Sequence, residues 1–416
     1  MDRSETIGKA PEAWIPQIIK ALKPPMVPDD LDWQASSFFK LRPVYDATAL
    51  GPEHAYLRTF HERWSALRQS KRPEFQVDLG PMLSSGADDL QEAELWGFAT
   101  WTLSSGLPPR DLGTGLPVHF RAWGEPGLAN HPHCDFDPLM DSLRLGTWAP
   151  GLKEKSLNYH IHASDVSHAG GSAVEEISLA LRIAEAYRQN LTPDEFKAHA
   201  GNWVIHLGCG TSFWLEMAKF RAMRILWMNF LYLHGVADQP GKIFGETSTF
   251  TWSHQDPDGN LLRHTSSLLS ALMGGADSIL IQPHTWDPGT GKDATRLAVN
   301  IGLLALEEAH LDQAFDPASG AYLLEILTHE LASAAWSQFQ SSARNDLFKD
   351  ILDGNIQKPI LETAKEFLSR VVSGEQVLVG VNKHQSPLAR KSPPMPVQKA
   401  VELPEFTPLE PVFADA

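Results

Sequence analysis

Cysteine is almost missing from this sequence: only Cys134 and Cys209 occur among 416 residues. Neither belongs to a CxxC pair, which excludes a disulfide framework and a cysteine-based zinc cluster as the basis of the fold. So little cysteine is typical of a reducing compartment. The first ten residues, MDRSETIGKA, contain no apolar core, so we expect no secretory signal and a cytoplasmic protein.

Basic runs, long apolar segments and common catalytic loops are also missing. The 35 Lys and Arg residues are outnumbered by 51 Asp and Glu, a formal net charge of −16, which argues against nucleic acid and anionic membranes as partners. The longest apolar stretch, residues 225–237, contains Asn229 and His234 and is too short to span a bilayer. No GxGxxG, GxxxxGK[ST] or GxSxG motif supports a nucleotide-binding or serine-hydrolase function.

What is present is the ordinary mixture of a folded protein, with 43% hydrophobic and 21% charged residues. From about residue 71, extended segments alternate with segments of helical periodicity, which predicts βαβ units and a parallel sheet. The number of units favours a closed (β/α)8 barrel over residues 71–385. The expected extended segments are 158–162, 203–207, 244–252, 278–282 and 377–381, and the expected helices are 173–189, 214–233, 259–273, 296–309 and 323–340.

Three local features complete the outline of the chain. Ser172, followed three residues later by Glu175, predicts a capping box at the start of helix 173–189. Residues 1–70 hold one or two helices and too little apolar mass for a core, so we interpret them as an arm lying on another surface. Residues 386–416 contain seven prolines and are expected to be extended.

Histidine is the residue type that suggests chemistry. Residues 131–135 (His-Pro-His-Cys-Asp) group four potential metal ligands, and His160 and His162 share one face of an expected strand. His206 and His284 lie at or near the ends of other strands. A barrel with these features resembles metal-dependent hydrolases of the amidohydrolase kind. The alternative is a set of hydrogen-bonded histidines, which is the commoner case in a chain with 17 of them.

The turn Gly208-Cys209-Gly210 offers a second, weaker hypothesis. It could face an anion before a helix, but a strand-to-helix turn is the commoner use of such glycines. Cys209 could be a nucleophile, although a small buried thiol is more common. Neither motif assigns a function.

The sequence from about 157 to 339 resembles the methylmalonyl-CoA mutase family, through a long series of residues in family order. The matching residues are 169–177 (AGGSAVEEI), 181–182, 213–221 (FWLEMAKFR), 224, 227, 256–257, 260–263 (NLLR), 274–278 (GGADS), 296, 300, 306–308, 316–317, 320–322, 327–328, 330–331, 335–336, 339 and 380–382. An ordered series of this length is far more specific than any single motif.

The resemblance implies a substrate-binding (β/α)8 barrel through which, in catalytic members, an acyl-CoA threads. A separate C-terminal domain of those members holds adenosylcobalamin and carries a DxHxxG motif whose histidine ligates cobalt. The reaction is an isomerisation, the radical rearrangement between methylmalonyl-CoA and succinyl-CoA. Methylmalonyl-CoA is therefore the implied substrate, and isobutyryl-CoA or a similar acyl-CoA is the alternative.

This sequence departs from the catalytic pattern at several places. It contains no DxHxxG motif, so we expect no cofactor on this chain. Ser164 and Asp165 stand where catalytic members carry a Tyr-His pair, and an ionised carboxylate cannot donate a hydrogen bond to a thioester carbonyl. Asn158, His160 and His162 replace small serines of the same strand and would refill the barrel. The threonine-arginine-glycine element of the N-terminal region is also missing.

These departures point to the non-catalytic small subunit of a heteromeric mutase. The catalytic large subunit would carry adenosylcobalamin, the arm of residues 1–70 would wrap that partner, and residues 386–416 would be a remnant of an interdomain linker. No residue is then expected to be catalytic or to bind a metal. Two alternatives stay open: a barrel subunit that borrows a cobalamin domain from another chain, and a metal-dependent hydrolase using His160 and His162.

Overall fold

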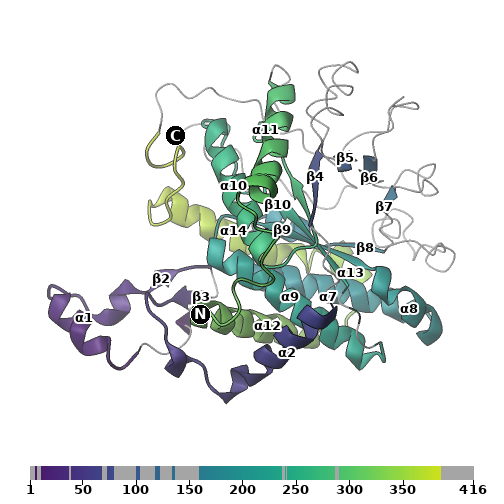
Figure 1. Cartoon of the computed structure of the whole chain (residues 1–416), viewed down its shortest axis with the longest axis horizontal. Coiled ribbons are helices and arrows are strands. Elements are labelled where there is room, and N and C mark those ends of the chain that lie inside the picture. The colour runs from purple at the N-terminus through teal and green to yellow at the C-terminus, as the bar shows by residue number, and fades with distance from the viewer. Residues whose placement is uncertain are drawn as a thin grey trace.

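The structure is a computed structural model. It describes residues 5–6, 11–36, 39–67, 73–78, 100–103, 118–121, 134–135, 159–236, 239, 241–285 and 290–385. A parallel sheet lies at the centre, with helices packed against it, and the N-terminal segment extends to one side (Figure 1). Among the described helices, none combines the length and the apolar composition needed to cross a bilayer.

Eight strands form the central sheet in the order β7-β6-β5-β4-β11-β10-β9-β8, and every pairing between neighbours is parallel. The first of these strands in the chain, β4, pairs with the last, β11, so the order follows a ring. In the part of the chain that the structure describes, no pairing joins β7 to β8. The prediction of a mixed α/β fold with a parallel sheet is confirmed, and closure into a barrel stays a prediction. The strands are β4 Glu74–Asp78, β5 Thr100–Leu103, β6 Val118–Arg121, β7 Cys134–Asp135, β8 His160–His162, β9 Val204–Cys209, β10 Lys242–Thr247 and β11 Ser278–Ile281.

The helices follow the predicted periodicity closely. Helix α7 occupies Ala173–Gln189, as predicted, and the helices predicted at 214–233, 259–273, 296–309 and 323–340 differ mainly at their ends. A further long helix, α14 Gln357–Val372, was not predicted. Helix α11 begins five residues before the predicted 296 and passes into a π-helical turn at Leu304–Glu308. The remaining helices of the body are α6 Ser164–His168, α8 Pro193–His199, α9 Phe213–Leu233, α10 Pro257–Met273, α12 Tyr322–Ser342 and α13 Leu347–Leu352.

The two faces of the sheet have different neighbours. Ile161, Ile205 and Ile279 belong to the main hydrophobic core, which includes residues of α7, α9 and α10. Side chains alternate along a strand, so the intervening residues lie on the opposite face. There Phe244 and Leu280 belong to a separate small cluster. Burial of both faces is typical of parallel sheets.

The N-terminal segment contacts the body at more than one place, since Phe39 and Leu41 belong to the main core and Trp64 of its last helix is also buried. It comprises β1 Glu5–Thr6, α1 Ile15–Ala21, β2 Trp33–Gln34, β3 Phe39–Leu41 and α2 Ala55–Leu67, with the strands in a small sheet of order β1-β3-β2. Trp64 of α2 is 1% exposed and lies against Gly275, where a Cβ atom would collide with its ring. Helix α1 buries no residue and lies at the far end of the segment (Figure 1).

The predicted strand at 377–381 is wrong. The chain forms a turn there, with φ of +80° at Gly380 and one isolated bridge between Val379 and Lys383. The side chain of Asn382 satisfies the local backbone instead of a neighbouring strand: its oxygen accepts from the Leu378 N–H at 2.8 Å, and its amide donates to two carbonyls. The alternation of apolar residues was too short to distinguish a strand from this turn.

Replacing Ser172 by alanine is expected to lower the free energy of unfolding by about 1 kcal/mol. The hydroxyl accepts from the Glu175 N–H at 3.2 Å, and the Glu175 carboxylate accepts from the Ser172 N–H at 2.7 Å, which confirms the predicted capping box. Urea denaturation would measure the change, with Ser172→Thr as the control that keeps the hydroxyl. Equal midpoints for the wild type and the alanine variant would contradict this role.

Candidate functional site

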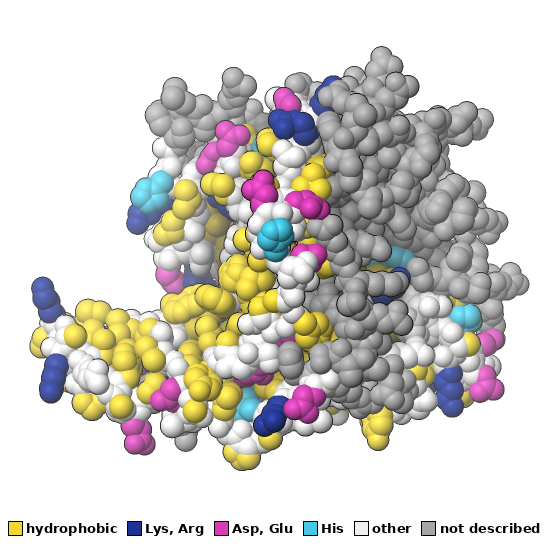
Figure 2. Space-filling view, viewed as in Figure 1, with side chains coloured by type: hydrophobic (Ala, Val, Ile, Leu, Met, Phe, Trp, Pro, Cys, Tyr) yellow, Lys and Arg dark blue, Asp and Glu magenta, His cyan; other side chains and the backbone are white. Residues whose placement is uncertain are grey.

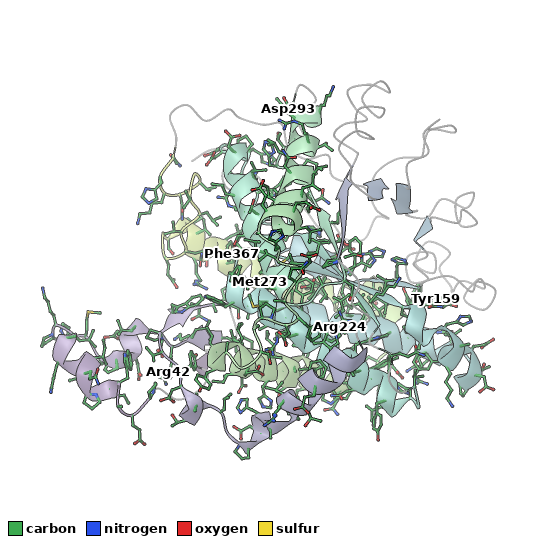
Figure 3. The ribbon with its side chains drawn as sticks, viewed as in Figure 1. Arg42, Tyr159, Arg224, Met273, Asp293 and Phe367 are labelled. Carbon is green, nitrogen blue, oxygen red and sulfur yellow. The ribbon has the colours of Figure 1, made fainter. Side chains whose placement is uncertain are left out.

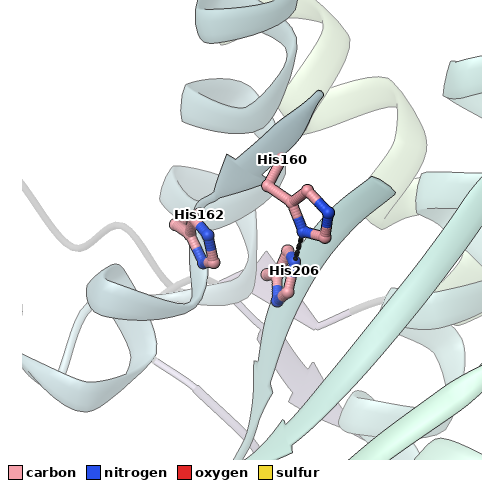
Figure 4. A group of neighbouring side chains, drawn as sticks. All are labelled: His160, His162 and His206. Carbon is pink, nitrogen blue, oxygen red and sulfur yellow. Dashed lines mark hydrogen bonds between the residues drawn. The ribbon is translucent and has the colours of Figure 1, made fainter. Parts of the chain in front are cut away.

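Three histidines form a buried cluster on the sheet face opposite the main core. His160 and His162 lie on β8, and His206 lies on β9, directly beside His162 in the strand register (Figure 4). The ring centroids of His162 and His206 are 4.0 Å apart, and those of His160 and His206 are 5.0 Å apart. None of the three residues is more than 9% exposed. The predicted shared face of His160 and His162 is confirmed.

A chain of hydrogen bonds runs through this cluster to a carboxylate. The Nδ1 atom of His160 lies 2.7 Å from Nε2 of His206, and Nδ1 of His206 lies 2.9 Å from Oε1 of Glu246 on β10. An ionised carboxylate only accepts, so His206 donates its Nδ1–H to Glu246 and accepts from His160 at Nε2. This bonding holds His206 in one tautomer.

The chain of polar groups continues toward the carboxyl ends of the strands. His168 of α6 places Nε2 3.5 Å from the second oxygen of Glu246 and Nδ1 3.1 Å from the Thr249 hydroxyl. Glu246 is fully buried, and His168 is partly buried. Sequence reasoning missed both Glu246 and His168. A polar residue at an inward-facing strand position, as in Lys242–Thr247, was the available signal for Glu246.

Aromatic rings fill the space beside the histidines. The ring of Phe244 on β10 lies 4.5 Å from that of His206, centroid to centroid. Val204 and Leu280 pack with Phe244 on the same face. These strands therefore present large side chains in mutual contact where a ligand channel would need small ones.

His264 and His284 form a separate polar group near the ends of β10 and β11. The indole N–H of Trp252 donates to Nε2 of His264 at 2.7 Å. Burial, together with nearby His284, lowers the pKa of His264 to about 3, so its ring is neutral. Among the described residues, the group with metal-compatible spacing comprises His160, His162 and His206, and His284 does not join it.

The other predicted positions have mixed outcomes. Ser164 is fully buried and Asp165 is exposed, both in the first turn of α6 directly after β8. Asn158, His131 and His133 lie outside the described residues. Cys209 is buried, with its thiol 3.0 Å from the Ser267 carbonyl oxygen, and burial raises its pKa, which suppresses thiolate chemistry.

Behind the strand ends, a lysine is buried between two glutamates. Nζ of Lys219 on α9 lies 2.6 Å from a carboxylate oxygen of Glu176 and 2.6 Å from one of Glu216, and it donates to the Gly208 carbonyl. Glu176 also accepts from the Gly208 N–H. Burial raises the pKa of Glu176 to about 7, while the neighbouring carboxylates raise the pKa of Lys219. The cluster ties α7 and α9 to the end of β9.

Two arginines of α9 are likewise used inside the molecule. Arg221 pairs with Asp316 at 3.1 Å and with Glu325 at 2.9 Å, which joins α9 to α12. Arg224 pairs with Asp277 at 2.6 Å and lies 5.2 Å from the Trp64 ring of α2; Figure 3 shows it in the interior. Both arginines therefore form ion pairs inside the fold.

Comparisons with known proteins identify sequences that are similar to this chain. Residues 151–409 match the family model described as methylmalonyl-CoA mutase. The methylmalonyl-CoA mutase small subunit of Porphyromonas gingivalis is 24% identical, over 89% of this chain and 69% of that protein. The small subunit of Propionibacterium freudenreichii subsp. shermanii is 28% identical, over 67% of this chain and 44% of that protein. A small subunit of Streptomyces virginiae is 33% identical, over 51% of this chain and 34% of that protein. The match thus spans less than half the length of the latter two relatives.

Replacing Glu176 by glutamine is expected to remove part of the pH dependence of stability. The pKa of this buried carboxyl is about 7 in the folded protein and near its ordinary 4.5 when unfolded. Its contribution is therefore greatest below pH 4.5 and is lost as the pH rises through 7. Denaturation of both proteins across this pH range would measure the difference.

The exposed Glu362→Gln is the matched control and should follow the wild-type profile. Parallel pH profiles for wild type and Glu176→Gln would contradict the raised pKa.

Proposed function

Because this chain belongs to the methylmalonyl-CoA mutase family, a family of isomerases, we propose that it is the non-catalytic small subunit of a heteromeric, adenosylcobalamin-dependent mutase. It would support a catalytic large subunit that interconverts methylmalonyl-CoA and succinyl-CoA. The small-subunit names of several relatives favour this assignment over a catalytic chain. The cytoplasm is the expected compartment on the sequence argument alone.

The observation that carries the proposal is the filled inner face of the sheet. We propose that the strands close into a (β/α)8 barrel, since β4 pairs with β11 and the order of the others follows a ring. The face bearing His162, His206 and Phe244 would then line the lumen, with its rings in contact. An acyl-CoA chain could not pass without displacing these side chains.

The position of the expected catalytic pair supports the same conclusion. Ser164 and Asp165 directly follow the histidine strand, where the family resemblance implies a tyrosine and a histidine. An ionised Asp165 cannot donate to a thioester oxygen, and its charge would oppose the negative charge that develops there. The same feature argues against a barrel subunit that borrows only a cobalamin domain, because that enzyme would still need both donors.

This chain's residues do not fit adenosylcobalamin. The DxHxxG motif is absent from the sequence. The buried histidines lie in contact with one another and with Phe244 on a face that Val204 and Leu280 also fill, so a group as large as the cofactor would have to displace these side chains. We therefore place the cofactor on the partner, where it supplies the radical chemistry.

The N-terminal segment offers a surface for that partner. Its exposed apolar side chains gather on one side of the molecule (Figure 2), and they are Ile15, Ile19, Met26, Val27 and Trp33. Exposed apolar patches of this kind mark interaction sites in folded proteins. Because α2 is anchored by Trp64 while α1 buries nothing, the outer part is free of the body and can lie on a second chain.

The test is to recover the tagged full-length chain from its native cells and to identify what accompanies it by mass spectrometry. We expect a large mutase chain in near-equal amount, with cobalamin-dependent mutase activity in the eluate and none in the tagged chain alone. Recovery of the chain without a mutase partner, or mutase activity of the isolated chain, would overturn the proposal.

Restoring the expected catalytic pair alone should not create an enzyme. Ser164→Tyr combined with Asp165→His is expected to show no mutase turnover when a cobalamin domain is supplied as a separate chain, because the inner face stays filled. A radical-mutase assay with methylmalonyl-CoA measures this, and circular dichroism confirms that the variant is folded. Turnover above the wild-type background would refute the filled-barrel argument.

Charging the N-terminal segment should weaken the complex without destabilising the chain. Ile19 and Val27 are 56% and 52% exposed, so Ile19→Glu with Val27→Glu costs little in the isolated protein. Desolvating two carboxylates at an interface should weaken binding of the large subunit roughly tenfold or more. Lys23→Gln, on the same segment, is the control. Unchanged affinity of the double variant would exclude this surface from the interface.

A further inference from the structure

We propose that His160, His162 and His206 form a binding site for a divalent transition metal ion, of the class that includes Zn²⁺ and Co²⁺. The site lies between β8 and β9, on the sheet face opposite the main core. It is a property of this chain alone and does not depend on the mutase partner. The expectation that this chain has no metal ligands came from the family resemblance, whereas this proposal comes from geometry.

Spacing is the first argument. One ring nitrogen from each histidine can be chosen so that all three lie within 4.8 Å of one another. In a tetrahedral site with metal–nitrogen bonds of about 2.0–2.1 Å, two ligand nitrogens are about 3.3 Å apart. The His160 and His206 nitrogens, at 2.7 Å, would separate by about 0.6 Å, and no pair would need to approach by more than about 1.5 Å. Rotations of the imidazole rings are sufficient for shifts of this size.

The second argument is the carboxylate behind His206. Metal-binding histidines usually donate their second ring N–H to a carboxylate or carbonyl, which fixes the tautomer and makes the ligand nitrogen more basic. Glu246 accepts from Nδ1 of His206 at 2.9 Å, so the lone pair of Nε2 points toward His160. The arrangement thus holds one ligand ready in the orientation that a metal needs.

The proton balance of binding follows from the same hydrogen bonds. Without a metal, the Nδ1–H of His160 occupies the lone pair of His206 Nε2. A metal would take the place of that proton, which moves to Nε2 of His160 so that the ring stays neutral, while His206 keeps its Nδ1–H on Glu246. No oxidant, reductant or further reactant is required.

The donor atoms decide the class of metal. Three neutral imidazole nitrogens suit Zn²⁺, Co²⁺, Ni²⁺ or Cu²⁺, whereas Mg²⁺ and Ca²⁺ require oxygen ligands. Thiolate ligation by Cys209 is excluded, since its Sγ bonds to Ser267 and Ser270 in the main core. A bound ion would cross-link β8 to β9 and hold the inner face filled.

The experiment uses the purified full-length chain, stripped with a chelator and then dialysed against Co²⁺ and against buffer. We expect stoichiometric Co²⁺ by elemental analysis, with the visible absorption of a tetrahedral nitrogen site. His160→Gln and His206→Gln should each lose this absorption and at least nine-tenths of the bound metal. The exposed His310→Gln is the matched control and should bind as the wild type does.

Two results would overturn the proposal. One is a folded wild-type chain that retains no Co²⁺ and no Zn²⁺, in which case the histidines form a metal-free hydrogen-bonded relay. The other is undiminished binding by the His160→Gln, His206→Gln double variant, which would place the metal elsewhere. The wild-type measurement decides the question even if a variant misfolds. Because no partner or substrate is present, neither result bears on the proposed subunit function.

Discussion

The strict alternation of side chains along buried parallel strands is the constraint on which this structure depends. Each strand from β8 to β11 has one set of residues in the helix-packed core and another on the opposite face. Water covers neither face, so any polar residue placed there must find a partner within the protein. On one face, His160, His206 and Glu246 bond to one another in a chain. At the ends of the strands, Lys219 pairs with two glutamates.

These two polar clusters have different consequences. Lys219 and its carboxylates lie among helices and backbone groups of β9, so they serve to position α7 and α9. In the proposed barrel, the histidine cluster would instead lie where an acyl chain passes in catalytic members. Its rings would then exclude substrate, and the same rings bring nitrogen atoms within 4.8 Å of one another. One set of substitutions can thus both close a channel and create a new site.

The loss of catalytic groups and the gain of exposed apolar surface fit a single account. On the proposed assignment, Ser164 and Asp165 replace the catalytic tyrosine and histidine, and the chain would act by supporting a partner. The projecting α1 region, apolar and unburied in the isolated chain, has the composition of a surface that another protein covers. The body that carries it is held rigidly by Arg221 and Arg224, which are used inside the fold.

Local patterns in the sequence were sufficient to predict several elements of this structure. Helix 173–189 and its capping box depend on contacts between near neighbours, which the sequence displays directly, and the shared face of His160 and His162 follows from strand periodicity alone. The turn at 377–381 was wrongly predicted as a strand because it depends on a hydrogen bond that local alternation does not reveal. The side-chain amide of Asn382 donates to the carbonyl oxygen of Val371 in helix α14. Only the tertiary structure could place His206 and Glu246 beside His160, since strand register, not spacing along the chain, sets that neighbourhood. The sequence by itself determined five of the long helices and the family resemblance, because both depend on near neighbours along the chain, whereas the packing of distant strands decided which polar side chains meet.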